Sequence, residues 1–155
     1  MDFVHDQFGD GRTFRVFAVI DDFPREAVAL CVGTSLTSSD AAVALARAFE
    51  HHGTPKALVC DNGPEFTSRH LQAWAEPLGI ELQFTEPGKP TQNAFAESFN
   101  SRFRDECLNT NWFEHLAHAR RVIEAWRVHY NTGRPHGALD NVPPSQFHQA
   151  WLQAA

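Results

Sequence analysis

Three apolar segments near the start of the chain are separated by connections too short to hold a helix. They run over residues 2–6, 14–21 and 27–32, and the connections contain the turn-forming residues Gly9 and Pro24. Connections this short join antiparallel strands, because a parallel pair needs a crossover of about a dozen residues or more. The sequence therefore predicts an antiparallel meander in this part of the chain.

Helices and strands alternate after the meander. The expected elements are a helix over 41–51, a strand over 56–60, a helix over 67–78 and a strand over 80–84, followed by helices over 93–108, 116–130 and 145–152. Strands that alternate with helices run parallel. We therefore expect one α/β domain over residues 1–155 with a five-stranded mixed sheet, three antiparallel strands followed by two parallel ones. This order is that of the ribonuclease H-like fold, and a fold alone does not define a function.

Composition bounds the kind of protein. No apolar run approaches the ~20 residues that a membrane span needs, and the acidic start lacks the basic region of a signal peptide. Three scattered cysteines favour a reducing compartment, so we expect a cytoplasmic protein. The net charge of −6 disfavours a nucleic-acid partner. However, a site built from carboxylates is negative until its cations bind, which weakens that objection.

Two aspartates occupy positions where a sheet presents ligands. Asp61 follows the strand 56–60 and precedes the turn residues Asn62 and Gly63. Ligands of α/β proteins lie at such carboxyl ends of parallel strands. Asp2 lies in the first strand, which would neighbour the fourth and bring Asp2 close to Asp61. An ordinary solvated turn at Asp61, a frayed terminus at Asp2, and Asp6 in place of Asp2 remain open alternatives.

A third carboxylate lies on the helix expected from residue 93. Phe95, Phe99 and Phe103 are spaced four residues apart and form an apolar stripe. Glu97 faces away from this stripe, and Arg104 lies two turns later on the same face as Glu97. The alternative is a charged, solvated helix face. If the three carboxylates converge, they form a site suited to Mg²⁺, which prefers oxygen ligands. Two such ions, ~3.5–4 Å apart, can catalyse phosphoryl transfer.

The motifs resemble the integrase catalytic core of bacterial insertion-sequence transposases, specifically the insertion sequence 3 family, which are distant relatives of retroviral integrases. That family carries an Asp, Asp, Glu triad, and here 35 residues separate Asp61 from Glu97. The flanking matches cover essentially the whole chain and are the stretches 1–4, 61–66, 87–90, 92–94, 97–100, 104–109, 130–131, 134–136 and 143–144. The resemblance makes Asp2 the first member of the triad, and residues 131–155 a C-terminal tail with a short helix.

The resemblance also implies an activity. Asp2, Asp61 and Glu97 would be catalytic and would bind Mg²⁺ or Mn²⁺, as two ions, for DNA cleavage and strand transfer without a covalent enzyme intermediate. Partners would be transposon ends, target DNA and further copies of the chain. The expected DNA contacts are Asn62, Lys89, Gln92, Asn93, Asn100, Arg104, Arg134 and His136.

The family's upstream helix-turn-helix part and the tryptophan usually just before the first aspartate are missing, which leaves recognition of transposon ends open. A catalytically inactive remnant that folds and binds DNA or self-associates is the alternative to an active core. A host nuclease of the same fold is a third hypothesis.

Overall fold

The first three strands form the predicted meander. The computed structural model describes residues 1–86 and 94–154. Strands β1 (Asp2–Gln7), β2 (Thr13–Asp21) and β3 (Glu26–Gly33) pair antiparallel in the order β1-β2-β3. Gly11, at φ +85°, supplies the left-handed residue of the β1–β2 turn, which favours glycine.

The following elements alternate as expected. They are α1 (Ser38–His52), β4 (Ala57–Cys60), α2 (Arg69–Ala75), the 3₁₀ turn η1 (Glu76–Leu78) and β5 (Glu81–Phe84). Thr37 and Asp40 form a capping box that begins α1. Gly79, left-handed at φ +69°, ends η1 before β5. Strands β4 and β5 pair in parallel from Ala57 opposite Glu81 to Cys60 opposite Phe84.

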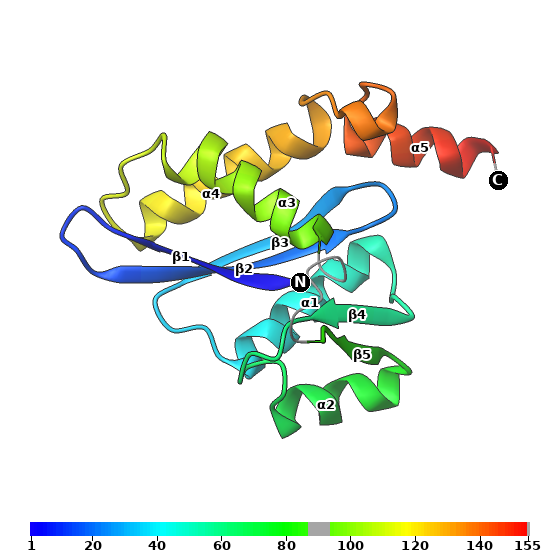
Figure 1. Cartoon of the computed structure of the whole chain (residues 1–155), viewed down its shortest axis with the longest axis horizontal. Helices are drawn as coiled ribbons and strands as arrows, with labels where there is room; N and C mark the ends of the chain where they lie inside the picture. The colour runs from blue at the N-terminus through cyan, green and yellow to red at the C-terminus, as the bar shows by residue number, and fades with distance from the viewer. Residues whose placement is uncertain (87–93, 155) are drawn as a thin grey trace.

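The prediction of a single five-stranded sheet is wrong in one respect. The described residues form a three-stranded sheet and a separate two-stranded sheet. The Met1 ammonium nitrogen donates a hydrogen bond to the Val59 carbonyl oxygen at 2.7 Å, and so links the start of β1 to β4. A single residue alongside β4 is too short to form a ladder of hydrogen bonds. Figure 1 shows the N-terminus close to β4.

Helices lie on both faces of the three-stranded sheet (Figure 1). One face is covered by α3 (Ala94–Phe103), the π-helical segment η3 (Arg104–Leu108) and α4 (Leu116–Thr132). The other face packs against α1 and, beyond it, α2. The expected helix over 93–108 is therefore an α-helix that continues as a π-helical turn.

Alternate residues of β2 serve the two faces. Phe14 and Val16 belong to the cluster beneath α3 and α4, whereas Phe17 and Val19 belong to the cluster beneath α1. All four side chains are buried. This alternation is the period-2 geometry of a strand buried on both faces.

The end of the chain docks through aromatic side chains. After the 3₁₀ turn η4 (Gly137–Leu139), α5 (Pro144–Ala154) places Phe147 and Trp151 against Phe23. The ring centroids lie 5.7 and 5.1 Å from that of Phe23, so these two rings fasten α5 to the β2–β3 turn. Of the helices in the described residues, none combines the length and apolar character required to cross a bilayer.

Candidate active site

Asp61 lies in a tight turn directly after β4. Its Oδ1 accepts a hydrogen bond from the Gly63 backbone nitrogen at 2.9 Å. A β-carbon at position 63 would lie 2.9 Å from that oxygen, so only glycine fits this turn without a shift. The Asn62 side-chain nitrogen donates to the Thr85 carbonyl at 2.7 Å and ties the turn to the residue after β5. The turn thus leaves the carboxylate of Asp61 exposed at the carboxyl end of the strand.

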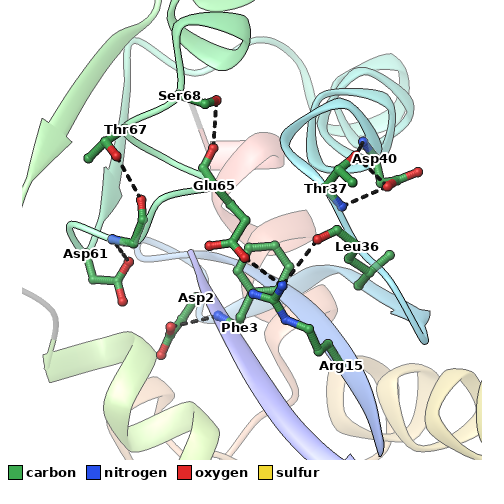
Figure 2. Close-up of polar contacts among 11 residues, drawn as sticks. Asp2, Phe3, Arg15, Leu36, Thr37, Asp40, Asp61, Glu65, Thr67 and Ser68 are labelled. Atoms are coloured by element: carbon green, nitrogen blue, oxygen red, sulfur yellow. Dashed lines mark hydrogen bonds and ion pairs between the residues drawn. The ribbon is translucent and has the colours of Figure 1, made fainter.

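Asp2 begins β1 beside Asp61, and its carboxyl group is half-buried. Burial raises the pKa of Asp2, and the negative charge of Asp61 raises it further. Hydrogen bonds from the Phe3 backbone nitrogen at 2.7 Å and the Asn100 side chain at 2.6 Å oppose this shift. Figure 2 shows the two carboxylates on adjacent segments. Two carboxylates this close repel each other, and a bound cation would relieve that repulsion.

Helix α3 brings its polar face to Asp2. Asn100 on this helix contacts the Asp2 carboxylate, and Glu97 lies three residues earlier, on the neighbouring turn of the same face. Phe99 and Phe103 are buried in the core, as the stripe predicts. Phe95, the first residue of the predicted apolar stripe, is 48% exposed, so the core takes up only the second and third residues of that stripe.

Phe95 is covered by an arginine from the β2–β3 turn instead. The guanidinium carbon of Arg25 lies 3.4 Å from the centroid of the Phe95 ring, within cation–π range. Arg25 has φ +58°, a left-handed conformation that is uncommon for residues other than glycine. The turn therefore holds the first turn of α3, two residues before Glu97.

The three predicted metal ligands are not gathered into one cluster. Within residues 1–86 and 94–154, no group of three or more His, Cys, Asp or Glu side chains is placed to hold a metal ion. Mutual repulsion opposes such a cluster when no cation is bound. Asp2 and Asp61 nevertheless offer the oxygen donors that Mg²⁺ prefers, and burial and the charge of Asp61 together raise the pKa of Asp2. The residues present therefore fit a divalent cation.

The predicted DNA contacts fall in different surroundings. Arg104 is exposed, and its Nη2 donates to the His5 carbonyl of β1 at 3.2 Å. Asn100 is turned to Asp2, and Asn62 to Thr85. Lys89, Gln92 and Asn93 lie outside the described residues.

Two predicted contacts near the C-terminus have protein partners. The Arg134 guanidinium binds the Glu106 carboxylate through both its Nε and Nη2 atoms. His136 is 2% exposed, with its Nε2 3.2 Å from the Tyr130 carbonyl oxygen and its ring at right angles to that of Tyr130. Because the His136 side chain does not reach the surface, the expected DNA contact is corrected to a packing role.

Sequence reasoning missed one ion pair that supports the site. Arg15 of β2 binds Glu65 at 2.6 Å, and its guanidinium carbon lies 4.1 Å from the centroid of the Phe3 ring. Both charged side chains are mostly buried, and Figure 2 shows the pair joining the sheet to the segment that follows Asp61. Phe66, next to Glu65, packs on Phe3 with ring centroids 5.2 Å apart. In the sequence, this ion pair is indicated only by the presence of a charged residue, Arg15, within an otherwise apolar strand.

This ion pair predicts a pH-dependent stability. The Arg15 guanidinium holds the pKa of Glu65 below its usual 4.5. The stabilisation is therefore present above pH 4.5 and is lost as the pH falls through the lowered pKa.

We expect Glu65→Gln to lower the free energy of unfolding by about 1.5–3 kcal/mol at pH 7, with a difference from wild type that shrinks in acid. Urea unfolding at several pH values measures this difference. Glu50→Gln, at an exposed position of α1, is the matched control, and an equal loss there would contradict the prediction.

The fold defines the class of this protein. A meander, two parallel strands separated by helices, and paired carboxylates at the start of β1 and the end of β4 make a ribonuclease H-like core. The HTLV-2 integrase catalytic core domain in complex with magnesium has this fold, with a TM-score of 0.70 and 16% sequence identity over 95% of each chain.

The chain belongs to the integrase core domain family. One model of that description matches residues 1–90 and a second matches residues 78–144. An insertion element IS407 protein of Burkholderia multivorans is 52% identical over 147 residues, covering 95% of this chain and 53% of the relative. The transposase for insertion sequence element IS904 of Lactococcus lactis is 32% identical over 100 residues, covering 63% of this chain and 40% of that protein. The chain thus spans about half the length, or less, of these two relatives.

Proposed function

We propose that this domain is the catalytic core of an insertion-sequence transposase, of the insertion sequence 3 type, which cleaves and joins DNA strands. The observation that carries the proposal is the placement of Asp2 beside Asp61, with α3 bound to Asp2 through Asn100. The start of β1, the turn after β4 and helix α3 come from different parts of the chain. Each contributes a polar side chain to this region of the integrase core.

Asp2, Asp61 and Glu97 would hold Mg²⁺ or Mn²⁺, as two ions. Such ions activate the attacking oxygen and stabilise the leaving oxygen of a phosphoryl transfer. Asn100 keeps the Asp2 carboxylate oriented through its 2.6 Å hydrogen bond. The Asp61 turn presents an exposed carboxylate whose orientation is fixed by Gly63. These residues supply the negative charge and the orientation, whereas the DNA phosphate supplies further oxygen ligands.

DNA would approach over the exposed side of α3 and the β4–α2 turn. Arg104, seven residues after Glu97, is an exposed cation at the start of η3. In the sequence, Asn62 directly follows Asp61, and Lys89, Gln92 and Asn93 precede Glu97 by four to eight positions. Two DNA ends are brought together in transposition, so we further propose that the chain assembles with other copies on DNA.

Strand joining is the activity to measure. The substrate is a branched DNA that mimics a strand-transfer product, incubated with the full chain and Mn²⁺, Mg²⁺, Ca²⁺ or EDTA. We expect a joined strand with Mn²⁺ or Mg²⁺ and none with EDTA. A contaminating nuclease, or a host nuclease of this fold, shortens strands without joining them. A folded chain that binds the DNA but joins no strand with any of these ions would contradict the proposal and favour the inactive remnant.

A further inference from the structure

Trp112 lies on the loop between η3 and α4, and its ring is held at the protein surface. The side chain is 74% exposed, although tryptophan is highly buried on average. A β-carbon at Gly9 would lie 2.5 Å from the indole Nε1 atom, so the ring packs directly against the β1–β2 turn. The Gly9 nitrogen donates to the Phe113 carbonyl at 2.8 Å, and Phe113 is buried against Phe14 (Figure 1). The loop therefore presents the indole in a fixed position.

A cavity of about 220 Å³ lies beside this ring, between the loop and the β1–β2 turn. Phe8 and Trp112 supply aromatic walls, and Asp6 of β1 supplies a carboxylate. Among the described residues that line the cavity, Asp6 alone carries a charge. The volume is below the ~300–1,000 Å³ of pockets for small molecules, so the cavity suits a single side chain.

Asp6 lies apart from the proposed metal site. It is four residues from Asp2 on the same face of β1, which is about 13 Å at the rise of a strand. Its Oδ1 accepts a hydrogen bond from the Gln7 backbone nitrogen at 2.8 Å, which leaves Oδ2 to accept one from a ligand.

The basic side chains on either side of Asp6 bind other groups. Arg12 pairs with Asp10 at 2.8 Å, and Arg104 donates to the His5 carbonyl at 3.2 Å. Neither of these two described residues lines the cavity. The carboxylate of Asp6 can therefore take a cation that comes from another molecule.

We propose that this cavity binds a cationic side chain, preferably an arginine, from a basic peptide segment of a partner protein. The guanidinium would lie on the Trp112 ring and donate hydrogen bonds to the Asp6 carboxylate. Tryptophan is the aromatic residue that best attracts a cation, and the planar guanidinium matches a carboxylate. A nucleobase could also stack on an exposed indole. Its phosphates would need basic residues, however, whereas the charge that lines this cavity is negative.

Two peptides test the site. Both are pentapeptides with blocked ends and a central residue between glycines, which is arginine in one and citrulline in the other. Citrulline has nearly the same shape as arginine but carries a neutral urea group. Each peptide is titrated into the full chain at low ionic strength, where exposed charges are least screened. Binding is followed on the indole N–H resonance of Trp112, which is assigned from the spectrum of Trp112→Phe.

We expect the arginine peptide to bind at least about threefold more tightly than the citrulline peptide, through the cation–π contact and the exposed ion pair. Asp6→Asn keeps an acceptor for the Gln7 nitrogen and should abolish this preference. Asp105→Asn, at an exposed position of η3, is the matched control and should retain it. Equal binding of the two peptides would overturn the proposal, and so would a preference for arginine that survives in Asp6→Asn.

A single-stranded oligothymidine tests the competing ligand, because it offers bases and phosphates but no cation. We expect it to leave the Trp112 resonance unchanged. A stronger response to the oligothymidine than to the arginine peptide would overturn the proposal and assign the ring to nucleic acid. None of these measurements requires a metal ion or catalysis, so their outcome is independent of the proposed transposase activity.

Discussion

Asp61→Asn is expected to lower the rate of metal-dependent strand joining by at least about a hundredfold, since loss of an outer-shell partner of a metal ligand already costs about 10–100-fold. The substitution removes the charge of Asp61 but keeps an oxygen that can accept the hydrogen bond from Gly63. The turn should therefore persist and Tm should change little. The rate is measured on the branched DNA with Mn²⁺.

A second readout follows from the same substitution. The charge of Asp61 raises the pKa of Asp2, so its removal should lower the pKa of Asp2, which NMR titration of the carboxyl carbon detects. Asp10→Asn is the matched control, because Asp10 also accepts a backbone hydrogen bond in a turn, from Arg12 at 3.0 Å. Strand joining that survives in Asp61→Asn, or an unchanged pKa of Asp2, would show that Asp61 is not part of the site.

Asn131→Ala is expected to destabilise the fold by about 1–3 kcal/mol and to lower Tm by roughly 2–12 °C. Asn131 is 4% exposed at the end of α4. Its side-chain amide accepts a hydrogen bond from the Ala27 nitrogen and donates one to the Ala27 carbonyl, each at 2.9 Å. Truncation would leave the buried Ala27 nitrogen without its partner, at a cost of ~1–3 kcal/mol. The Ala27 carbonyl oxygen would keep the hydrogen bond from the Arg127 Nη1 at 3.0 Å.

The isosteric Asn131→Asp separates hydrogen bonding from packing. It retains the acceptor for the Ala27 nitrogen but places a carboxylate oxygen against the Ala27 carbonyl. We expect a large loss of stability at pH 7 that is partly recovered in acid, where the protonated carboxyl group can donate. Urea unfolding gives both values, and Asn109→Ala, at an exposed position, is the control. A cost no greater than that of Asn109→Ala would show that Ala27 finds other partners.

The sequence predicts those features whose causes are local. The short connections and the apolar alternation of β2 were sufficient for the meander, because turn length and strand period act over a few residues. The turn at Asp61 was predictable for the same reason. Asp2 required the family resemblance, because its meaning depends on a neighbour that is 59 positions away in the sequence.

Features that depend on distant partners escaped prediction. The amide of Asn131 substitutes for a strand partner of Ala27, and no local pattern around either residue indicates this. The burial of His136 was hidden because a histidine beside Arg134 and Pro135 is typical of an exposed turn. Helical periodicity likewise did not reveal that the helix becomes π-helical at Arg104, because the buried positions at Cys107 and Leu108 fit either geometry.

The β2–β3 turn imposes opposing demands on evolution. A glycine in place of Arg25 would suit the left-handed backbone at φ +58° and would remove the guanidinium from Phe95. A more stable turn and a well-positioned Glu97 on α3 therefore require different residues at position 25. The arginine at position 25 keeps the contact with Phe95 at the cost of one strained residue.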